Sequence, residues 1–212
     1  VHSLGVRTLN VTKTSIIEKG VGQLLLEDLF MRAMNRYFGN VRFDLILYST
    51  PPITFNKVIK AAKRRNPGAM TYLLLKDIFP QNAVDMGMLS KSGVRGLLYK
   101  MFRRKEKQLY RISDFIGCMS PANVRYVLEH NPEVSADKVE VAPNSYDLNT
   151  SSNTLQSGAA VRIREKYGLP VDKPIFIYGG NMGKPQGIPF LIECLKAVKD
   201  RDDCHFLLVG DG

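Results

Sequence analysis

The sequence predicts an α/β protein that contains two sets of parallel strands. Short apolar runs, which are typical of buried strands, alternate with segments whose apolar residues recur at helical spacing. Strands that are joined through helices run parallel, because the helix returns the chain to the starting edge of the sheet. A polar segment rich in Ser, Thr and Asn, residues 147–158, divides the pattern into the two sets.

The first set contains four predicted strands, each followed or preceded by a helix. We expect strands over residues 41–48, 70–75, 115–119 and 139–142. Helices are expected over residues 15–38, 57–65, 95–113 and from Pro121 onward. Gly39-Asn40 and Asn66-Pro67-Gly68 end the first two helices. Ser120 and Pro121 supply an N-cap and a first-turn proline for the last one.

The second set is shorter and includes a glycine-rich turn. Strands are predicted over residues 174–178 and 205–209, and helices over residues 161–167 and 190–198. The expected domains are therefore residues 1–146 and 159–212, joined by the linker 147–158. Two open sheets of this kind would place a ligand cleft at the carboxyl ends of their strands.

The composition argues against a disordered, membrane-spanning or secreted protein. The 212 residues carry 30 basic and 20 acidic side chains, and 44% of them are hydrophobic, which excludes disorder for the bulk of the chain. The chain has no apolar run of membrane-spanning length, no signal peptide and three cysteines without CxxC spacing, so a cytoplasmic protein is expected. It begins with Val and ends just after an apolar strand, so we expect an internal piece of a longer chain in which both sheets are incomplete.

The glycine-rich turn is the sharpest local signal. Gly179, Gly180, Gly183 and Gly187 lie between an apolar strand and an amphipathic helix, with Lys184 among them. Exposed N–H groups at a helix N-terminus suit a phosphate. The pattern is neither a Walker A motif nor GxGxxG, and an ordinary glycine-bearing turn without a ligand remains the alternative.

A second candidate is Asp77, which directly follows the predicted strand at residues 70–75. An acid at the carboxyl end of a buried parallel strand is well placed to face a cleft. A helix N-cap or a loop ion pair is the alternative interpretation.

The third candidate is a basic helix. Residues 91–111 contain eight basic side chains and one acid, interleaved with aromatic and aliphatic residues. Such a segment can lie on an anionic membrane, bind nucleic acid or simply present a solvated face. The predicted membrane-facing cations are Arg103, Arg104, Lys105 and Lys107. The three histidines are scattered without metal-ligand spacing, and no metal site is predicted.

Several segments, taken in order, resemble family 4 glycosyltransferases of GT-B fold, in particular bacterial members that build capsule, colanic-acid-like or lipopolysaccharide glycans. The similar segments are Phe43-Asp44-Leu45-Ile46 with Ser49-Thr50-Pro51-Pro52, Asp77-Ile78-Phe79-Pro80-Gln81, residues 116–120, Val141-Ala142-Pro143-Asn144-Ser145-Tyr146-Asp147, residues 165–170 and 176–187, and Leu208-Val209-Gly210-Asp211-Gly212.

The resemblance implies two Rossmann-like halves and retaining sugar transfer from a nucleotide-diphosphate sugar, with no cofactor. Asp77 would be the catalytic residue on the acceptor side, and Asn144 and Asp147 the hinge between domains. The donor diphosphate would lie on Gly180, Asn181, Gly183, Lys184, Gln186 and Gly187. Gly210, Asp211 and Gly212 would form the nucleotide-side turn. The family often has Arg and Lys where Asn181 and Gln186 stand here.

The implied partners are the donor, a glycan or lipid-linked acceptor and an anionic membrane surface, with no nucleic acid. The location would be the cytoplasmic side, at the periphery of the inner membrane. The family's E-x7-E element is absent from the sequence, so this segment alone is expected to lack activity. The alternatives are an epimerase of the same fold and a non-enzymatic basic α/β binding protein.

Overall fold

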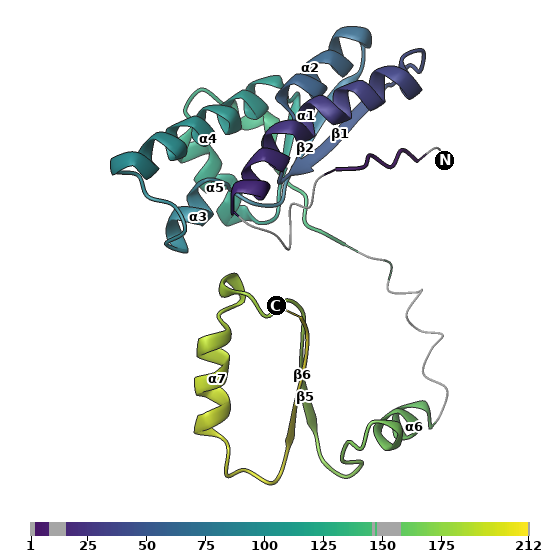
Figure 1. The fold of residues 1–212 in the computed structure, drawn as a ribbon, viewed down its shortest axis with the longest axis vertical. Coiled ribbons are helices and arrows are strands. Elements are labelled where there is room, and N and C mark those ends of the chain that lie inside the picture. Colours follow the sequence, from purple (N-terminus) through teal and green to yellow (C-terminus); the bar gives the residue numbers. More distant parts are fainter. Residues whose placement is uncertain (1–2, 9–15, 146, 148–157, 212) are drawn as a thin grey trace. The chain divides into compact units, whose positions relative to one another are not determined.

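The computed structural model describes residues 3–8, 16–145, 147 and 158–211, and among these the side chains other than those of residues 16–24, Arg95 and Lys184. The chain forms two compact units, unit 1 over Val1–Asn144 and unit 2 over Ser145–Gly212. Each contains a parallel sheet, so the α/β class with Rossmann-like parallel halves is confirmed (Figure 1). Residues 148–157 of the predicted linker lie outside the described residues.

Unit 1 is built on a four-stranded parallel sheet in which the strands follow one another in sequence order. The strands are β1 (Leu45–Thr50), β2 (Met70–Leu75), β3 (Phe115–Cys118) and β4 (Val139–Val141). Thr50 pairs with Leu75, Leu75 with Cys118, and Cys118 with Val141. All four strands therefore end at the same level, and the loops that follow them emerge from one edge.

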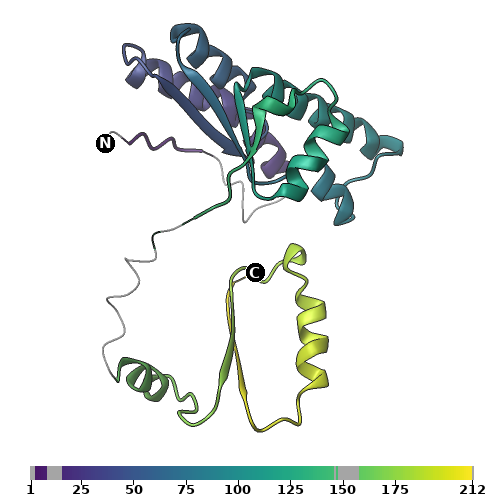
Figure 2. The same cartoon turned by 180° about the vertical axis from the view of Figure 1, so that it is seen from behind.

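The described part of unit 1 contains the helices α1 (Ile16–Phe38), α2 (Asn56–Arg65), α3 (Gln81–Asp85), α4 (Gly93–Ile112) and α5 (Pro121–His130). Helix α1 precedes β1, whereas α2, α4 and α5 connect successive strands and pack on one side of the sheet. Because parallel crossovers are right-handed, successive crossovers in one direction place their helices on the same face. Helices α2, α4 and α5 contact the strands, and α1 packs against α2, as Figures 1 and 2 show from opposite sides.

The core of unit 1 lies between the sheet and these helices. Alternate strand residues point into it, including Ile46, Leu73 and Ile116, and they meet Tyr110 of α4 and Val127 of α5. The residues between them face the other way. That second face leaves large apolar side chains exposed: Leu45, Leu47, Met70, Phe115 and Val141.

The boundaries of the elements follow the sequence pattern closely, with three main differences. The first strand begins at Leu45 instead of residue 41, because the ladder with β2 begins where the Met70 N–H donates to the Asp44 carbonyl at 2.8 Å. It also continues beyond the predicted end at residue 48, since Ser49 and Thr50 pair with Leu74 and Leu75. The five-residue helix α3 was not predicted, and it lies directly after Pro80 without a side-chain N-cap. Helix α5 begins as predicted, with Ser120 Oγ accepting from the Asn123 N–H.

Unit 2 contains α6 (Ala159–Lys166), β5 (Ile175–Gly179), α7 (Ile188–Ala197) and β6 (His205–Val209), and β5 pairs with β6 in parallel. Phe176 and Phe206 stack on one face of this two-stranded sheet, with ring centroids 5.4 Å apart. None of the unit 2 side chains that the structure describes is buried. Two strands bury too little surface to be stable in isolation, so unit 2 has little core of its own.

Gly117 in β3 tests the packing of the sheet. A Cβ there would lie 2.5 Å from Tyr72 Oη and 2.7 Å from Ala142 Cβ, whereas a Cβ on Gly68 would meet nothing within 4 Å. We expect Gly117→Ala to lower the free energy of unfolding by about 1–3 kcal/mol through overpacking. Gly68→Ala is the matched control and should change it little. Urea denaturation followed by circular dichroism measures both, and equal midpoints for the two variants would contradict this packing.

Candidate functional site

A pocket of about 290 Å³ opens beyond the carboxyl end of β2. It lies between the loop that follows β2, helix α3 and the first two turns of α5. Its lining residues are Lys76, Asp77, Ile78, Gln81, Asn82, Asp85, Asn123 and Tyr126. The sequence-predicted Asp77 is therefore part of a hollow surface at the edge of the sheet where a ligand is expected in open α/β folds.

Two buried oxygen atoms of this pocket lack a hydrogen-bond partner within the described part of the chain. They are Oε1 of Gln81 and Oδ1 of Asn82. The Gln81 amide is oriented by its own Nε2, which donates to Asp85 Oδ1 at 2.6 Å. A buried carbonyl oxygen without a donor costs about 1–3 kcal/mol. A ligand that brings hydroxyl groups would remove that cost.

The backbone of Asp77 is tied to the neighbouring strand. Thr50, the last residue of β1, is 1% exposed, and its Oγ1 donates to the Asp77 carbonyl at 3.2 Å. This bond joins the end of β1 to the loop that follows β2. The Asp77 residue itself is exposed, so its carboxylate is accessible to a ligand in the pocket.

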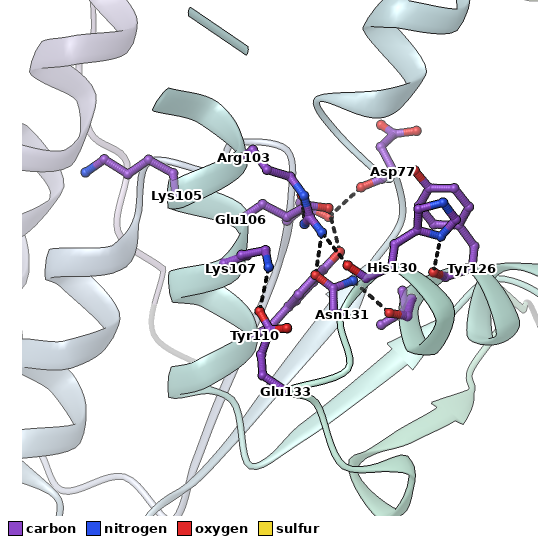
Figure 3. A network of polar contacts seen from close by, with 12 residues as sticks. Asp77, Arg103, Lys105, Glu106, Lys107, Tyr110, Tyr126, His130, Asn131 and Glu133 are labelled. Atoms are coloured by element: carbon purple, nitrogen blue, oxygen red, sulfur yellow. Dashed lines mark hydrogen bonds and ion pairs between the residues drawn. The ribbon is translucent and has the colours of Figure 1, made fainter. Parts of the chain in front are cut away.

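The opposite wall of the pocket is held by a polar network between α4 and α5 (Figure 3). Arg103 of α4 donates to Glu106 Oε2 at 2.5 Å, to Asn131 Oδ1 at 2.6 Å and to the His130 carbonyl at 2.9 Å. His130 stacks on Tyr126, with ring centroids 3.9 Å apart. The network thus fixes the end of the helix that carries the pocket residue Tyr126.

Glu106 is the buried acid of this network. It is 3% exposed, and Tyr110 Oη donates to its Oε1 at 2.6 Å. Burial raises the pKa of the Glu106 carboxyl above its ordinary value, although the Tyr110 hydroxyl and the Arg103 charge oppose that rise. Burial, followed by the charge of Glu106, raises the pKa of Tyr110 well above its ordinary value.

The four cations that were predicted to face a membrane occupy different environments. Arg103 bonds inward to the network, and Lys107 forms an ion pair with Glu133 at 2.9 Å. Lys105 is half-buried and points away from the network (Figure 3). Arg104 is exposed. The basic segment is therefore not a single cationic surface.

The glycine-rich turn of unit 2 is closed against the end of β6. The Gly180 N–H donates to the Val209 carbonyl at 3.0 Å, and the Met182 N–H donates to the Asp211 carbonyl at 3.2 Å. Both N–H groups are thus engaged within the protein. Gly187 is the N-cap of α7 and has a φ of 64°. This left-handed backbone conformation is rare for residues that have a Cβ.

The predicted donor residues lie on one continuous stretch of this turn. Gly183 is followed by a 3-10 helix over Lys184–Gln186, and the Gln186 N–H donates to the Gly183 carbonyl at 3.1 Å. The Asn181 carbonyl accepts from Tyr178 Oη at 2.6 Å. The structure also brings Gly210 and Asp211 to the turn, whereas Gly212 and the Lys184 side chain lie outside the described residues.

Asn144 and Asp147, the predicted hinge, flank the division between the units. Asn144 is the last residue of unit 1, and Asp147 belongs to unit 2. Both are exposed. Their role as a hinge stays a prediction.

Sequence reasoning missed half of the pocket lining. Asn82, Asn123 and Tyr126 were not singled out, although Asn123 and Tyr126 are three residues apart and so lie on one side of a helix that begins at the edge of the sheet. Gln81 entered only as part of a motif. In the described ranges, no group of three or more His, Cys, Asp or Glu side chains is placed to hold a metal ion.

Gly210 tests how the turn is closed. A Cβ at this position would collide with the Gly180 carbonyl oxygen, whereas a Cβ on Gly179 would meet nothing within 4 Å. We expect Gly210→Ala to push the turn away from β6 and to increase amide hydrogen exchange at Gly180 and Met182. Gly179→Ala is the control and should leave both amides protected. Protection that is unchanged in Gly210→Ala would mean that the two turns are not in contact.

Comparisons with known proteins relate the chain to glycosyltransferases. It is 22% identical to the probable glycosyltransferase WbjE of Pseudomonas aeruginosa over 200 residues, which cover 94% of the chain and 47% of the relative. It is 25% identical over 145 residues to the putative colanic acid biosynthesis glycosyl transferase WcaI of Escherichia coli K12, which covers 68% of the chain and 34% of that relative. No protein-family model matches.

A shorter match has a higher identity. The chain is 34% identical over 66 residues to the D-inositol 3-phosphate glycosyltransferase of Xylanimonas cellulosilytica, which covers 30% of the chain. The chain spans about half the length of WbjE and about a third of the length of WcaI. All of these relatives are glycosyltransferases by name, and the resemblance seen in the sequence is confirmed: the chain is a relative of the glycosyltransferases.

Proposed function

We propose that the protein transfers a sugar from a nucleotide-diphosphate donor to a hydroxyl group of an acceptor, and that the pocket beyond β2 binds the acceptor. The observation that carries this proposal is the pair of buried oxygens of Gln81 and Asn82, which have no donor in the described structure and lie beside Asp77. Hydroxyl groups are donors that can satisfy such oxygens. A sugar presents several of them at once.

Asp77 has the role of binding and orienting the reacting hydroxyl. A carboxylate accepts a hydrogen bond from a hydroxyl more strongly than a neutral group does. Holding the hydroxyl in position lowers the entropic part of the activation barrier, because the acceptor is already ordered when it binds. The bond from Thr50 to the Asp77 carbonyl fixes the loop on which this carboxylate is carried.

The donor diphosphate is assigned to the tip of the glycine-rich turn and to the start of α7. The reaction breaks the bond between the sugar and the diphosphate, which leaves with the bonding electrons, so the protein must stabilise negative charge there. The N–H groups of Gly180 and Met182 already donate to carbonyl groups of the protein. We therefore assign the binding of the diphosphate to Gly183, Lys184 and the N-terminus of α7.

The acceptor class that we propose is a growing surface glycan, free or linked to a lipid, with retention of configuration at the transferred sugar. The name of WcaI, a relative in colanic acid biosynthesis, supports the glycan class. The retaining outcome follows from the resemblance to family 4 enzymes.

Substitution of the two amides tests the acceptor pocket. Because the chain spans about half the length of its relative WbjE, the test measures binding rather than turnover. A panel of neutral oligosaccharides is screened by saturation-transfer difference NMR, and the affinity of the best ligand is then titrated. We expect Gln81→Ala and Asn82→Ala each to weaken binding about fivefold, the loss of one hydrogen bond.

Asn40→Ala is the matched control, since Asn40 is exposed and lies in the turn after α1, outside the pocket. Asp77→Asn should weaken binding more than either amide variant, because it removes a charged acceptor. Unchanged affinity in all three pocket variants, or an absence of saccharide binding, would contradict the assignment of the acceptor.

The donor assignment is tested separately at Lys184. We expect Lys184→Ala to weaken the binding of nucleoside diphosphates several-fold, because a phosphate group loses a cation near the N-terminus of α7. Lys199→Ala, which changes an exposed lysine beyond the far end of α7, should leave affinity unchanged. Isothermal titration of the nucleoside diphosphates measures both variants. Equal affinities would remove Lys184 from the donor site.

A further inference from the structure

A second hollow, of about 420 Å³, lies on the surface of α4, and we call it the α4 groove. Its lining residues are Tyr99, Lys100, Arg103, Arg104, Lys107, Gln108 and Arg111. Five of these seven residues are cations, and none of them is an acid. The volume is typical of small-ligand pockets, which measure about 300–1,000 Å³. Neither α4 nor any other helix in the described ranges is long and apolar enough to cross a membrane.

The charge of the groove is only partly compensated. Arg103 pairs with Glu106, and Lys107 pairs with Glu133. The other three cations are exposed and have no acidic partner within the described part of the chain: Lys100, Arg104 and Arg111. Because they recur at helical spacing along α4, their charges face the same side of the helix. The groove therefore suits a ligand that carries negative charge.

The groove adjoins the pocket beyond β2. Burial, followed by the nearby Tyr99, raises the pKa of Tyr126 above its ordinary value. Tyr99 lines the groove and Tyr126 lines the pocket. Arg103 of the groove also donates to the His130 carbonyl at 2.9 Å, and the His130 ring stacks on Tyr126 (Figure 3). A saccharide that is held in the pocket can therefore extend into the groove.

The two hollows differ in the sign of their charge. The pocket lining contains two acids, Asp77 and Asp85, and one cation, Lys76. An anionic group placed against the two carboxylates would be repelled. A ligand that occupies both hollows must therefore be free of negative charge in the pocket and anionic in the groove.

We propose that the α4 groove binds acidic sugar residues of the acceptor glycan, whose carboxylates contact Lys100, Arg104 and Arg111 while a neutral sugar residue of the same glycan occupies the pocket. The inference rests on the proposed function, because it takes the pocket as the acceptor site. The guanidinium group presents paired N–H donors that match the two oxygens of a carboxylate. Tyr99 and Gln108 supply neutral hydrogen-bonding groups for sugar hydroxyls.

The division of charge favours an acidic glycan over a nucleic acid. A nucleic acid carries a phosphate at every nucleotide, so a strand that filled both hollows would place negative charge against Asp77 and Asp85. A glycan can alternate neutral and acidic sugar residues. Its neutral hydroxyls then meet the unpaired oxygens of Gln81 and Asn82, and its carboxylates meet the cations of α4.

Isothermal titration of the 212-residue chain with three tetrasaccharides tests the proposal. The hyaluronan tetrasaccharide alternates acidic and neutral sugars, its carboxyl-reduced form is neutral, and tetragalacturonate is acidic throughout. We expect the hyaluronan tetrasaccharide to bind about tenfold more tightly than its reduced form, with a difference that shrinks as salt is added. It should also bind more tightly than tetragalacturonate, although it carries less charge, because no carboxylate has to enter the pocket.

Two groove cations are tested with the double variant Lys100→Gln and Arg104→Gln. It should lower the affinity for the hyaluronan tetrasaccharide about tenfold and leave the affinity for the reduced form unchanged. The matched control is Lys60→Gln with Arg64→Gln, which removes the same charge at the same spacing from exposed positions on α2. Asp77→Asn should weaken the binding of both forms, since the neutral sugar lies beside it.

Several results would each overturn this inference. Equal affinities for the hyaluronan tetrasaccharide and its reduced form would remove the acidic sugar and leave the proposed acceptor pocket intact. Tighter binding of tetragalacturonate, or an equal loss of affinity in the α2 control, would indicate attraction by net charge alone. Hyaluronan binding that Asp77→Asn leaves unchanged would separate the groove from the pocket. Displacement of the tetrasaccharide by a lower concentration of a short DNA duplex would assign the groove to nucleic acid.

Failure of the proposed function would give a different result. In that case the reduced tetrasaccharide and the other neutral oligosaccharides would not bind at all, whether or not the groove cations are present.

Discussion

Parallel pairing in register is the constraint on which the rest of unit 1 depends. Because Thr50, Leu75, Cys118 and Val141 stand opposite one another at the ends of their strands, the segments that follow them meet at one edge. The pocket collects Asp77 and Gln81 from the chain after β2 and Tyr126 from the chain after β3. A shift of one residue in this register would send each strand's core side chains to the opposite face. The core and the candidate site therefore depend on the same register.

The α4–α5 network adds the second constraint, which is electrostatic. Glu106 is buried, and a buried charge is tolerated only when it is paired and hydrogen-bonded. Arg103 and Tyr110 meet that requirement, and the remaining hydrogen-bonding capacity of Arg103 is used at the end of α5. An apolar contact would allow α5 to slide along α4. The planar guanidinium group of Arg103 donates in fixed directions, so its bonds to α5 hold that helix, which carries Tyr126, in one position relative to α4.

The sequence contained enough information to predict nearly every strand and long helix, because these depend on local periodicity and on caps such as Ser120-Pro121. It also indicated that Asp77, which directly follows a buried parallel strand, could face a cleft, and Asp77 lines the pocket. It could not predict that Gln81 and Asn82 line the same pocket, because α3 is a five-residue helix without a side-chain cap. The sequence could not predict the hydrogen bond of the Gly180 N–H either, since its acceptor, the Val209 carbonyl, is 29 residues away.

The charges of α4 show why a count of residues along a helix cannot assign a surface. Arg103 and Arg104 are neighbours in sequence, yet one bonds to a buried acid and the other is exposed. The single acid of the segment, Glu106, lies on the core side and neutralises a cation there. It therefore does nothing to reduce the charge of the outer side, where Lys100, Arg104 and Arg111 lie next to exposed apolar residues. The direction in which Glu106 points thus separates the helix into a side that supports the pocket and an exposed side that keeps its positive charge.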